Sequence, residues 1–452
     1  MKNKTALLSM GLCLVAPASF ADSPEISMEQ RLQRLEQRLY SAESRAQTAE
    51  DEIKQLKSSQ TVSHTQPVPV VGTASANETR NNKTEPTLTL SGFGDLKFYG
   101  DVEFNMDAES RKGSLISQRD DSNEKWDING RILLGFDGYR GLNDGRFAGF
   151  TVQPLADLNG SVNLDDAAFF IGKEQNWKMK VGRFEAFDMF PLNQDTFIEH
   201  SGNTANDLYN DGHGYIYMMK EGRGRSDSGG SFMLSKQLDN WYFELNTLVE
   251  NGSSLLVDKK YHGRQIDNEK NVVYLRPVIS WSEDVLSAAV AMESNVVNNA
   301  WGYYDQQGKW VNQSRRNGYG ATFTWNGLKK DPDNGIVVNL NTAYLDASGE
   351  KDFTAGINAL WQRFELGYIY AHNKIEQFDG RSLANCDDGC WITQKGTYDI
   401  HTLHTSYQLP DLMDMKNFNI YLGAYWSWLD EKDGDESMHD RYGARVRFKY
   451  FF

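Results

Sequence analysis

The chain has 452 residues, of which 39% are hydrophobic, and a formal net charge of −15 at pH 7. This acidic balance argues against a nucleic-acid partner, because binding a phosphate backbone requires concentrated basic residues. No run reaches the roughly 20 apolar residues that a helix needs to cross a bilayer, so spanning helices are not expected. Spanning strands remain open, because only every second residue of such a strand faces lipid.

The chain starts with a segment, residues 1–21, that is typical of a secretory signal peptide. Lys2 and Lys4 precede an apolar stretch, and Ser19-Phe20-Ala21 offers a small-x-small cleavage site. Cys13 lies inside the apolar stretch and is expected to be removed with it. The mature protein is therefore expected to be exported.

The other two cysteines, Cys386 and Cys390, lie in the sequence Asn-Cys-Asp-Asp-Gly-Cys-Trp. In an exported protein, an even pair at this spacing predicts a disulfide that closes a small loop. Metal binding is the alternative, but no histidine or second cysteine pair lies nearby in the sequence. We therefore expect a disulfide and no metal site.

Residues 22–57 carry the repeat of a coiled coil. Apolar positions recur at spacings of four and three over four heptads, namely Met28, Leu32, Leu35, Leu39, Ala42, Ala46, Ala49, Ile53 and Leu56. The flanking pairs that a parallel arrangement brings together are all opposite in charge: Arg31–Glu36, Arg38–Glu43, Arg45–Glu50 and Glu52–Lys57. We expect a parallel coiled coil, and the motif Arg-Leu-x-x-Leu-Glu at 31–36 favours a trimer. A single helix packed on the rest of the protein is the alternative.

The next segment, residues 58–86, is rich in Ser, Thr, Asn and Pro and has almost no periodicity. This composition predicts a flexible linker. Because a chain enters an outer-membrane barrel from the periplasm, we expect the linker and the coiled coil to lie there.

The last eleven residues, 442–452, alternate strictly between apolar and polar side chains. Tyr442, Phe448 and Phe452 belong to the apolar phase, whereas Arg445 and Arg447 belong to the basic phase. Such a strand fits a membrane barrel, with one face toward lipid and the other toward a wet lumen. A final strand that ends in Phe also resembles the insertion signal of bacterial outer-membrane proteins.

The same alternation begins at Thr87 and persists to the end of the chain, with aromatic residues at the ends of many apolar faces. We expect residues 87–452 to form an all-β, transmembrane antiparallel β-barrel of 16 strands, with 18 as the alternative. A soluble β-sandwich is the other candidate fold. It would not explain lipid-style aromatic faces on so many strands.

The sequence contains no recognisable catalytic motif, so we expect neither an enzyme nor a cofactor. A barrel of this size leaves an aqueous channel, and its function is therefore expected to be the passage of solutes.

One stretch of the barrel, residues 187–214, lacks clear alternation. We expect it to fold inward and present carboxylates at a constriction, because long loops are usually functional or disordered; these are Asp188, Asp195, Glu199, Asp207 and Asp211. An external acidic loop is the alternative.

A row of basic residues is expected on the inner wall, and its members are Arg131, Arg183, Arg445, Arg447 and Lys449. Facing the carboxylates, this row would create a transverse field across the constriction. Alternatively, the basic residues of the last strand pair with Asp95, Asp101 and Glu103 of the first strand and close the barrel.

Aromatic residues in the inward phase are candidates for contact with sugar rings, and they are Tyr99, Tyr242, Tyr421 and Tyr425. Phe184 shares this phase, but the alternation reveals no run of stacked inward aromatic residues. The stretch from Trp301 to Asp305, together with Trp310, is expected either to collect sugars at the mouth or to form an exposed hairpin, which we favour.

The layout of signal peptide, coiled coil, linker and barrel resembles that of the sucrose porin. The motif VGRFEAFDMFPLNQDTF at 181–197 and the end at 442–452 resemble the raffinose-type glycoporins, and this resemblance covers about residues 87–452. It implies a homotrimeric channel for oligosaccharides in the outer membrane of a Gram-negative bacterium. A general ion porin is an alternative, as is a structural or adhesive protein whose coiled coil binds peptidoglycan.

Overall fold

The computed structural model describes residues 87–90, 94–110, 125–194, 196, 217, 228–255, 260–261, 264–305, 307–376, 395–431 and 440–452. All of them belong to the second of two compact units, Val70–Phe452. The predictions that lie outside the described residues concern the signal peptide, the coiled coil, the linker, the Cys386–Cys390 disulfide, and Asp195, Glu199, Asp207 and Asp211.

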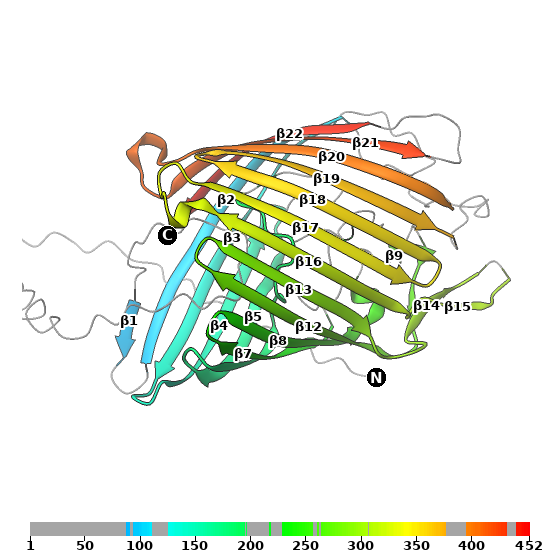
Figure 1. Ribbon diagram of the computed structural model, residues 1–452, viewed down its shortest axis with the longest axis horizontal. Helices are drawn as coiled ribbons and strands as arrows, with labels where there is room; N and C mark the ends of the chain where they lie inside the picture. Colours follow the sequence, from blue (N-terminus) through cyan, green and yellow to red (C-terminus); the bar gives the residue numbers. More distant parts are fainter. Residues whose placement is uncertain are drawn as a thin grey trace, which may run out of the picture. The chain divides into compact units, whose positions relative to one another are not determined.

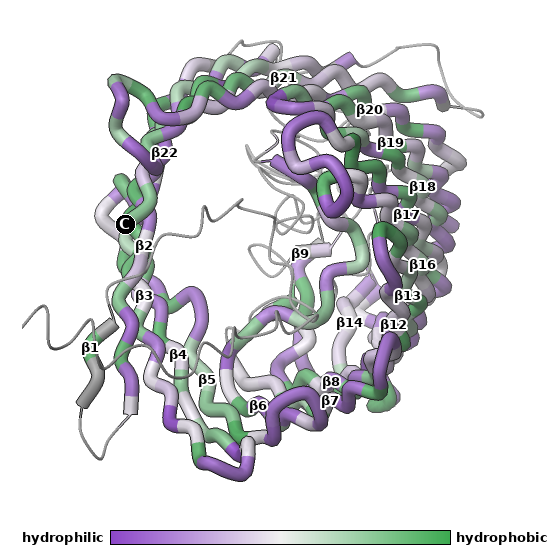
Figure 2. The backbone as a smooth tube through the Cα atoms, turned by 60° about the vertical axis from the view of Figure 1, so that its left-hand side comes forward, coloured by the Kyte–Doolittle hydropathy of each residue, from purple (hydrophilic) through white to green (hydrophobic). Residues whose placement is uncertain are grey.

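Within these ranges, sixteen antiparallel strands close into a barrel (Figures 1 and 2). The predicted fold class is thus confirmed, with the smaller of the two strand numbers. In ring order the strands are β2 (Gly94–Glu109), β3 (Lys125–Gly141), β4 (Arg146–Asp157), β5 (Val162–Lys173), β6 (Trp177–Arg183), β7 (Gly230–Leu238), β8 (Trp241–Asn251), β12 (Asn271–Glu283), β13 (Leu286–Asn295), β16 (Arg316–Asn326), β17 (Ile336–Ala347), β18 (Glu350–Trp361), β19 (Phe364–Ile375), β20 (Gly396–Leu409), β21 (Phe418–Glu431) and β22 (Arg441–Phe451).

An additional strand, β1 (Thr87–Leu90), pairs with the beginning of β2, from Gly94 to Lys97. The final strand, β22, pairs with β2 only from Asp101 onward. Because β3 occupies the other edge of β2, β1 and β22 share one edge. β1 therefore extends the sheet where the chain ends and adds no strand to the ring.

The two ends of the barrel differ in their connections. Turns of two to four residues join β3 to β4, β5 to β6, β7 to β8, β12 to β13 and β18 to β19 at the end where the chain terminates. Connections at the other end are mostly longer and carry β9 (Lys260–Tyr261), β10 (Arg264–Gln265), β11 (Asp267–Asn268), β14 (Trp301–Tyr304) and β15 (Trp310–Asn312) (Figure 1). Short turns are periplasmic in barrels of this class, so β14 and β15 lie at the external end.

Helical structure in the described ranges is limited to short 3-10 turns, which include η1 (Gly252–Leu255), η3 (Gly327–Lys329) and η5 (Leu412–Asp414). No helix among the described residues has the length and apolar character needed to cross a membrane.

The alternation of side chains separates an apolar outer face from a mostly polar inner face. On β22, Tyr442, Tyr450 and Phe452 are each more than 40% exposed, whereas Arg445 and Arg447 are 3% exposed. The predicted phase of this strand is therefore correct. The period of two in a strand produces the separation once one face meets lipid.

The inner side chains of β22 and β2 form a closure seam. Both Nε and Nη2 of Arg445 donate to the carboxylate of Asp107 at 2.6 Å. Arg447 donates from Nε to Asn105 at 2.6 Å and lies 3.1 Å from Glu103, and Lys449 lies 3.5 Å from the same carboxylate.

The pairing of β22 with β2 was expected from the sequence, but one of the proposed partners is wrong. Asp95 precedes the part of β2 that pairs with β22, and it lies opposite Tyr139 of β3. Asp101 and Glu103 lie within the paired part, and Arg131 is 3.9 Å and 3.6 Å from their carboxylates.

We predict that Arg445→Ala destabilises the folded barrel by about 3–5 kcal/mol, because it leaves the buried Asp107 carboxylate without its cation. Unfolding in urea, followed by tryptophan fluorescence, measures the loss. The matched control is Arg315→Ala, since the Arg315–Asp346 pair at 2.9 Å is largely exposed and is expected to contribute about 0–1 kcal/mol. Equal losses in the two variants would contradict a special role for the seam.

Candidate functional site: the lumen and its inner wall

A segment that follows β6, residues 184–194, lies inside the barrel and reaches the opposite wall. The backbone N–H groups of Asn193 and Gln194 donate to the two carboxylate oxygens of Glu365 at 3.0 and 2.5 Å. Glu365 is a fully buried residue on the inner face of β19. In the ring of sixteen strands, β19 lies half-way round from β6. The segment therefore crosses the lumen.

Further contacts hold this crossing segment against the inner wall. Asn339 of β17 donates to the side chain of Asn193 at 3.2 Å. The ring of Phe190 lies over Gly356 of β18, where a Cβ atom would come within 2.3 Å of it. Phe187 stacks on Tyr242 of β8 with ring centroids 6.1 Å apart. Both hydrogen bonds and aromatic contacts therefore hold the crossing segment against the inner wall.

A second point of the same connection also contacts the inner wall. Tyr217 is fully buried, its hydroxyl donates to Glu293 of β13, and its ring lies beside Gly318 of β16. The described part of the predicted constriction stretch, residues 187–194, therefore folds inward.

Asp188 is the one predicted constriction carboxylate within the described ranges. It lies on the crossing segment, is 9% exposed, and accepts the backbone N–H of Phe190 at 3.0 Å. Its carboxylate therefore helps to shape a turn of the crossing segment.

The predicted basic row is only partly assembled. Arg131, Arg445 and Arg447 lie together at the closure seam. Arg183 does not lie at the seam, because it shares the outward phase of Val181 on β6. Its Nε donates to the carbonyl oxygens of Leu164 and Asp165 at 2.6 and 3.1 Å. The inward basic residues of β6 are instead Lys178 and Lys180.

The four predicted sugar-contacting tyrosines all belong to the inner phase, but they lie against the wall. The ring of Tyr99 covers Gly135, and its hydroxyl bonds to Asp137 and Gln153 at 3.0 and 2.8 Å. Tyr242, Tyr421 and Tyr425 are each at most 7% exposed. Among these four, only the half-buried Tyr99 offers part of its surface to a solute.

Three other aromatic residues form a run on the inner wall near the periplasmic end, which we call the aromatic track. Tyr139 of β3 stacks on Phe147 of β4 at 5.7 Å between ring centroids, and Phe147 meets Phe170 of β5 at 6.1 Å. The ammonium of Lys178 lies 4.8 Å from the Phe170 ring, and Glu174 accepts the Tyr139 hydroxyl at 2.8 Å. The track thus combines aromatic faces with polar groups.

The aromatic track could not be found by reading one strand at a time, because its members come from three strands that only the register brings together. A local signal exists, since each aromatic residue precedes an inward glycine by two positions: Gly141, Gly149 and Gly172. A Cβ atom at Gly149 would lie 2.5 Å from the Phe170 ring, and one at Gly172 would lie 2.7 Å from Phe147. These glycines leave room for the rings.

The track lies in the half of the barrel where the inner wall is accessible. The inner side chains of β8 and β17 are all buried, and those of β12 and β20 are buried except at the strand ends, where Ser282, Gly396 and Gln408 are half-buried. On β3, β4 and β5, by contrast, Arg131, Asp137, Gln153 and the three track residues are only half-buried. Solutes that follow the inner wall would therefore meet the track.

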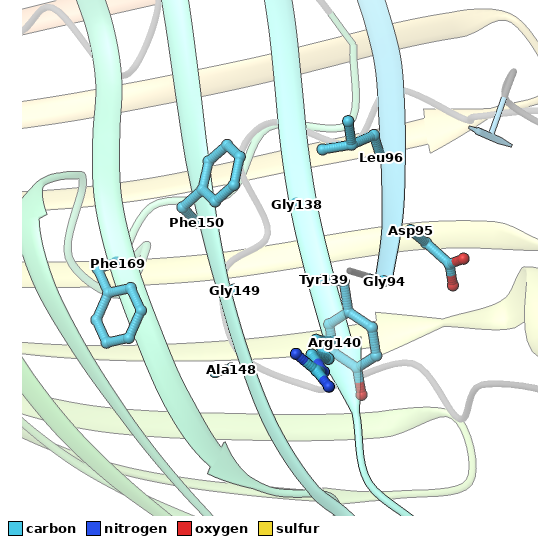
Figure 3. Close-up of a pocket in the computed structure, with 10 residues that line it drawn as sticks. All are labelled: Gly94, Asp95, Leu96, Gly138, Tyr139, Arg140, Ala148, Gly149, Phe150 and Phe169. Carbon is cyan, nitrogen blue, oxygen red and sulfur yellow. The ribbon is translucent and has the colours of Figure 1, made fainter. Parts of the chain in front are cut away.

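The outer wall carries a groove of about 380 Å³ over the same strands (Figure 3). Leu96, Phe150 and Phe169 line it from the outward phase, and the Phe150 ring lies over Gly138. This groove faces away from the lumen and is not part of the channel.

Comparison with known proteins identifies the family to which the chain belongs. The sequence model of a family described as porin-like glycoporin RafY matches residues 98–452. The chain belongs to this family. The predicted likeness of the barrel to raffinose-type glycoporins is therefore confirmed, whereas the likeness of the coiled coil is not tested.

Two solved porin structures are similar to this member of the glycoporin family. OprB of Pseudomonas putida has a TM-score of 0.52 at 10% identity, covering 79% of this chain and 94% of its own. An anion-selective porin from Comamonas acidovorans has a TM-score of 0.47 at 12% identity, covering 79% and 99%. No curated protein matches the sequence. Family and barrel together identify an outer-membrane porin and indicate a channel rather than an enzyme.

We predict that Glu365→Ala detaches the crossing segment from β19 and raises the single-channel conductance, because alanine cannot accept the N–H groups of Asn193 and Gln194. Planar-bilayer recording in KCl measures the change. Glu376→Ala, which removes an exposed carboxylate just beyond the other end of β19, is the control and should leave conductance unchanged. Identical conductance in wild type and Glu365→Ala would show that the segment does not limit the channel.

Proposed function

We propose that this porin carries out the passive diffusion of sugars and short oligosaccharides across the outer membrane. The aromatic track of Tyr139, Phe147 and Phe170 carries the proposal. A pyranose ring has an apolar face of C–H groups and an edge of hydroxyls. The aromatic rings of the track offer a surface on which the apolar face of the sugar can stack. The neighbouring Glu174 and Lys178 offer hydrogen-bond partners for its hydroxyls.

The strength of the expected interaction suits transport. Aromatic contacts contribute about 0.5–1.5 kcal/mol each, so a track of this kind holds a sugar only weakly. Weak contacts at successive positions let a solute enter and leave, which a channel requires. The family description, porin-like glycoporin, agrees with a sugar as the solute.

Passage of ions and small polar solutes is the second candidate, and the charged inner wall favours it. Arg131, Asp137, Lys178 and the Lys180–Asp166 pair at 3.7 Å place both signs of charge along the accessible half. The two candidates are compatible, because a channel wide enough for a hydrated sugar also conducts ions.

We further propose that the channel works as a homotrimer in the outer-membrane lipid, with the coiled coil in the periplasm. The heptads of residues 22–57 support a parallel trimer, and the apolar outer face of β2 to β5 supports a contact between copies. On that face Trp126 and Ile128 are more than 70% exposed. Peptidoglycan remains a candidate partner of the coil.

We predict that the double variant Phe147→Ala/Phe170→Ala raises the concentration of raffinose that half-blocks the ion current by about 3- to 10-fold, since it removes the stacking surface. Sugar titration of single channels in a planar bilayer measures this value. The control is Phe232→Ala/Phe243→Ala, which removes two outward rings from β7 and β8, away from the proposed contact between copies, and should leave the block unchanged. A wild-type channel that raffinose and maltotriose neither block nor permeate would overturn the proposal.

A further inference from the structure

A small external sheet lies beyond the rim of the barrel, in the connections that follow β8 and β13 (Figure 1). Strand β14 pairs with β15, which places Tyr304 opposite Trp310 and Gly302 opposite Asn312. Strand β11 pairs with the other edge of β14 and places Asp267 opposite Gly302. Opposite residues in an antiparallel pair lie on one face. Tyr304, Trp310, Gly302, Asn312 and Asp267 therefore share a face.

The other face of this sheet explains what holds it in place. Trp301, Tyr303 and Val311 lie there and pack with the buried inner residues of the barrel. Trp301 is 1% exposed and meets Tyr261 edge to face at 5.9 Å. The expected exposed hairpin is thus present, but half of its aromatic residues serve as an anchor.

The outer face carries two neighbouring aromatic rings whose planes are tilted by 59° to each other. The ring of Tyr304, which is 52% exposed, lies 5.2 Å from that of the half-buried Trp310. The indole N–H of Trp310 donates to Asn299 at 2.7 Å, which fixes the orientation of the ring. The same ring lies over Gly302, where a Cβ atom would be 3.1 Å away. The indole ring of Trp310 is therefore oriented before any ligand arrives.

Amide groups surround these rings. Asn299 holds Trp310, and Asn312 donates to Asn298 at 3.1 Å. The turn between the strands is closed by Asp305, whose side chain accepts the N–H groups of Gln307 and Lys309 at 3.0 and 2.8 Å. Amides beside exposed rings, with the exposed Asp267 carboxylate on the same face as an acceptor, suit a neutral ligand that has both C–H faces and hydroxyls.

We propose that the Tyr304–Trp310 face is an external capture site for neutral oligosaccharides. This proposal rests on the proposed function, because a capture site raises the local concentration of a sugar that the channel then conducts. A ring that is exposed to water and yet held by a hydrogen bond is preorganised for stacking, which lowers the entropy lost on binding. The site lies at the external end, where nutrients first meet the protein.

The test measures binding and passage separately. Raffinose and maltotriose are titrated against the purified full-length protein in detergent, by isothermal titration calorimetry and by ligand-observed NMR. Trp310→Ala is expected to weaken binding about 3- to 10-fold, and Tyr304→Phe, which keeps the ring, is expected to bind like wild type. Asn299→Ala, which frees the indole, should give an intermediate loss.

Two controls exclude misfolding and general effects of removing a tryptophan. Trp361→Ala removes a 54% exposed tryptophan beside a periplasmic turn and should leave binding unchanged. Unaltered KCl conductance of Trp310→Ala shows that the barrel has formed. In proteoliposomes, Trp310→Ala should reduce sugar uptake at low external concentration and match wild type at high concentration.

The outcomes separate the two proposals. Binding of sugar by wild type that Trp310→Ala retains in full would overturn the capture site, even if the channel conducts sugar. Failure of wild type to conduct sugar, with binding that depends on Trp310, would overturn the proposed function alone. Absence of binding by the wild-type protein would overturn the capture site.

Discussion

The closure of the sheet is the constraint on which the rest of the structure depends. In hydrocarbon, every backbone N–H and C=O needs an internal partner, so a strand edge cannot remain open. The edge of β2 is closed by β22, and the backbone of Phe452 bonds to Gly100 in both directions at 3.0 and 3.1 Å. The inner side chains then secure that joint through the Arg445–Asp107 pair. Without this joint, neither an inner nor an outer face exists.

Inside the closed barrel, several aromatic side chains lie in close contact with glycines of the wall. Phe190 lies over Gly356, Tyr99 over Gly135, and Phe170 beside Gly149. In each case a side chain on the glycine would occupy the space of the ring. A ring that lies flat on a glycine occupies space that a side chain would otherwise fill, so these rings project less far into the lumen.

The strand pattern could be predicted from the sequence because a period of two is local information. The phase of 442–452 is correct for that reason, and the length of the barrel segment limits the number of strands to 16 or 18, of which the structure has 16. Arg183 shows an error that the sequence itself could have prevented, since Val181 already marks its phase as outward.

Contacts between distant strands could not be predicted in the same way, because they depend on register. The partner of Arg445 is Asp107 and not Asp95, because the register places Asp107 opposite Arg445 and β22 ends seven residues short of the start of β2. The aromatic track requires the alignment of three strands, and the crossing segment requires the closed ring that places Glu365 opposite β6. No pattern within one strand contains that information.

The crossing segment has a consequence for the shape of the passage. A chain that lies along a diameter divides the lumen into two lanes, and the inner side chains of β8 and β12 in one lane are buried, except Ser282 at the end of β12. Solutes that follow the half-buried inner residues of β3 to β5 would then pass between the segment and that wall. A passage between a chain segment and a wall selects solutes by their thickness more than by their length. A linear trisaccharide that lies flat on the wall should pass about as readily as a disaccharide, whereas a branched sugar of the same mass should be held back.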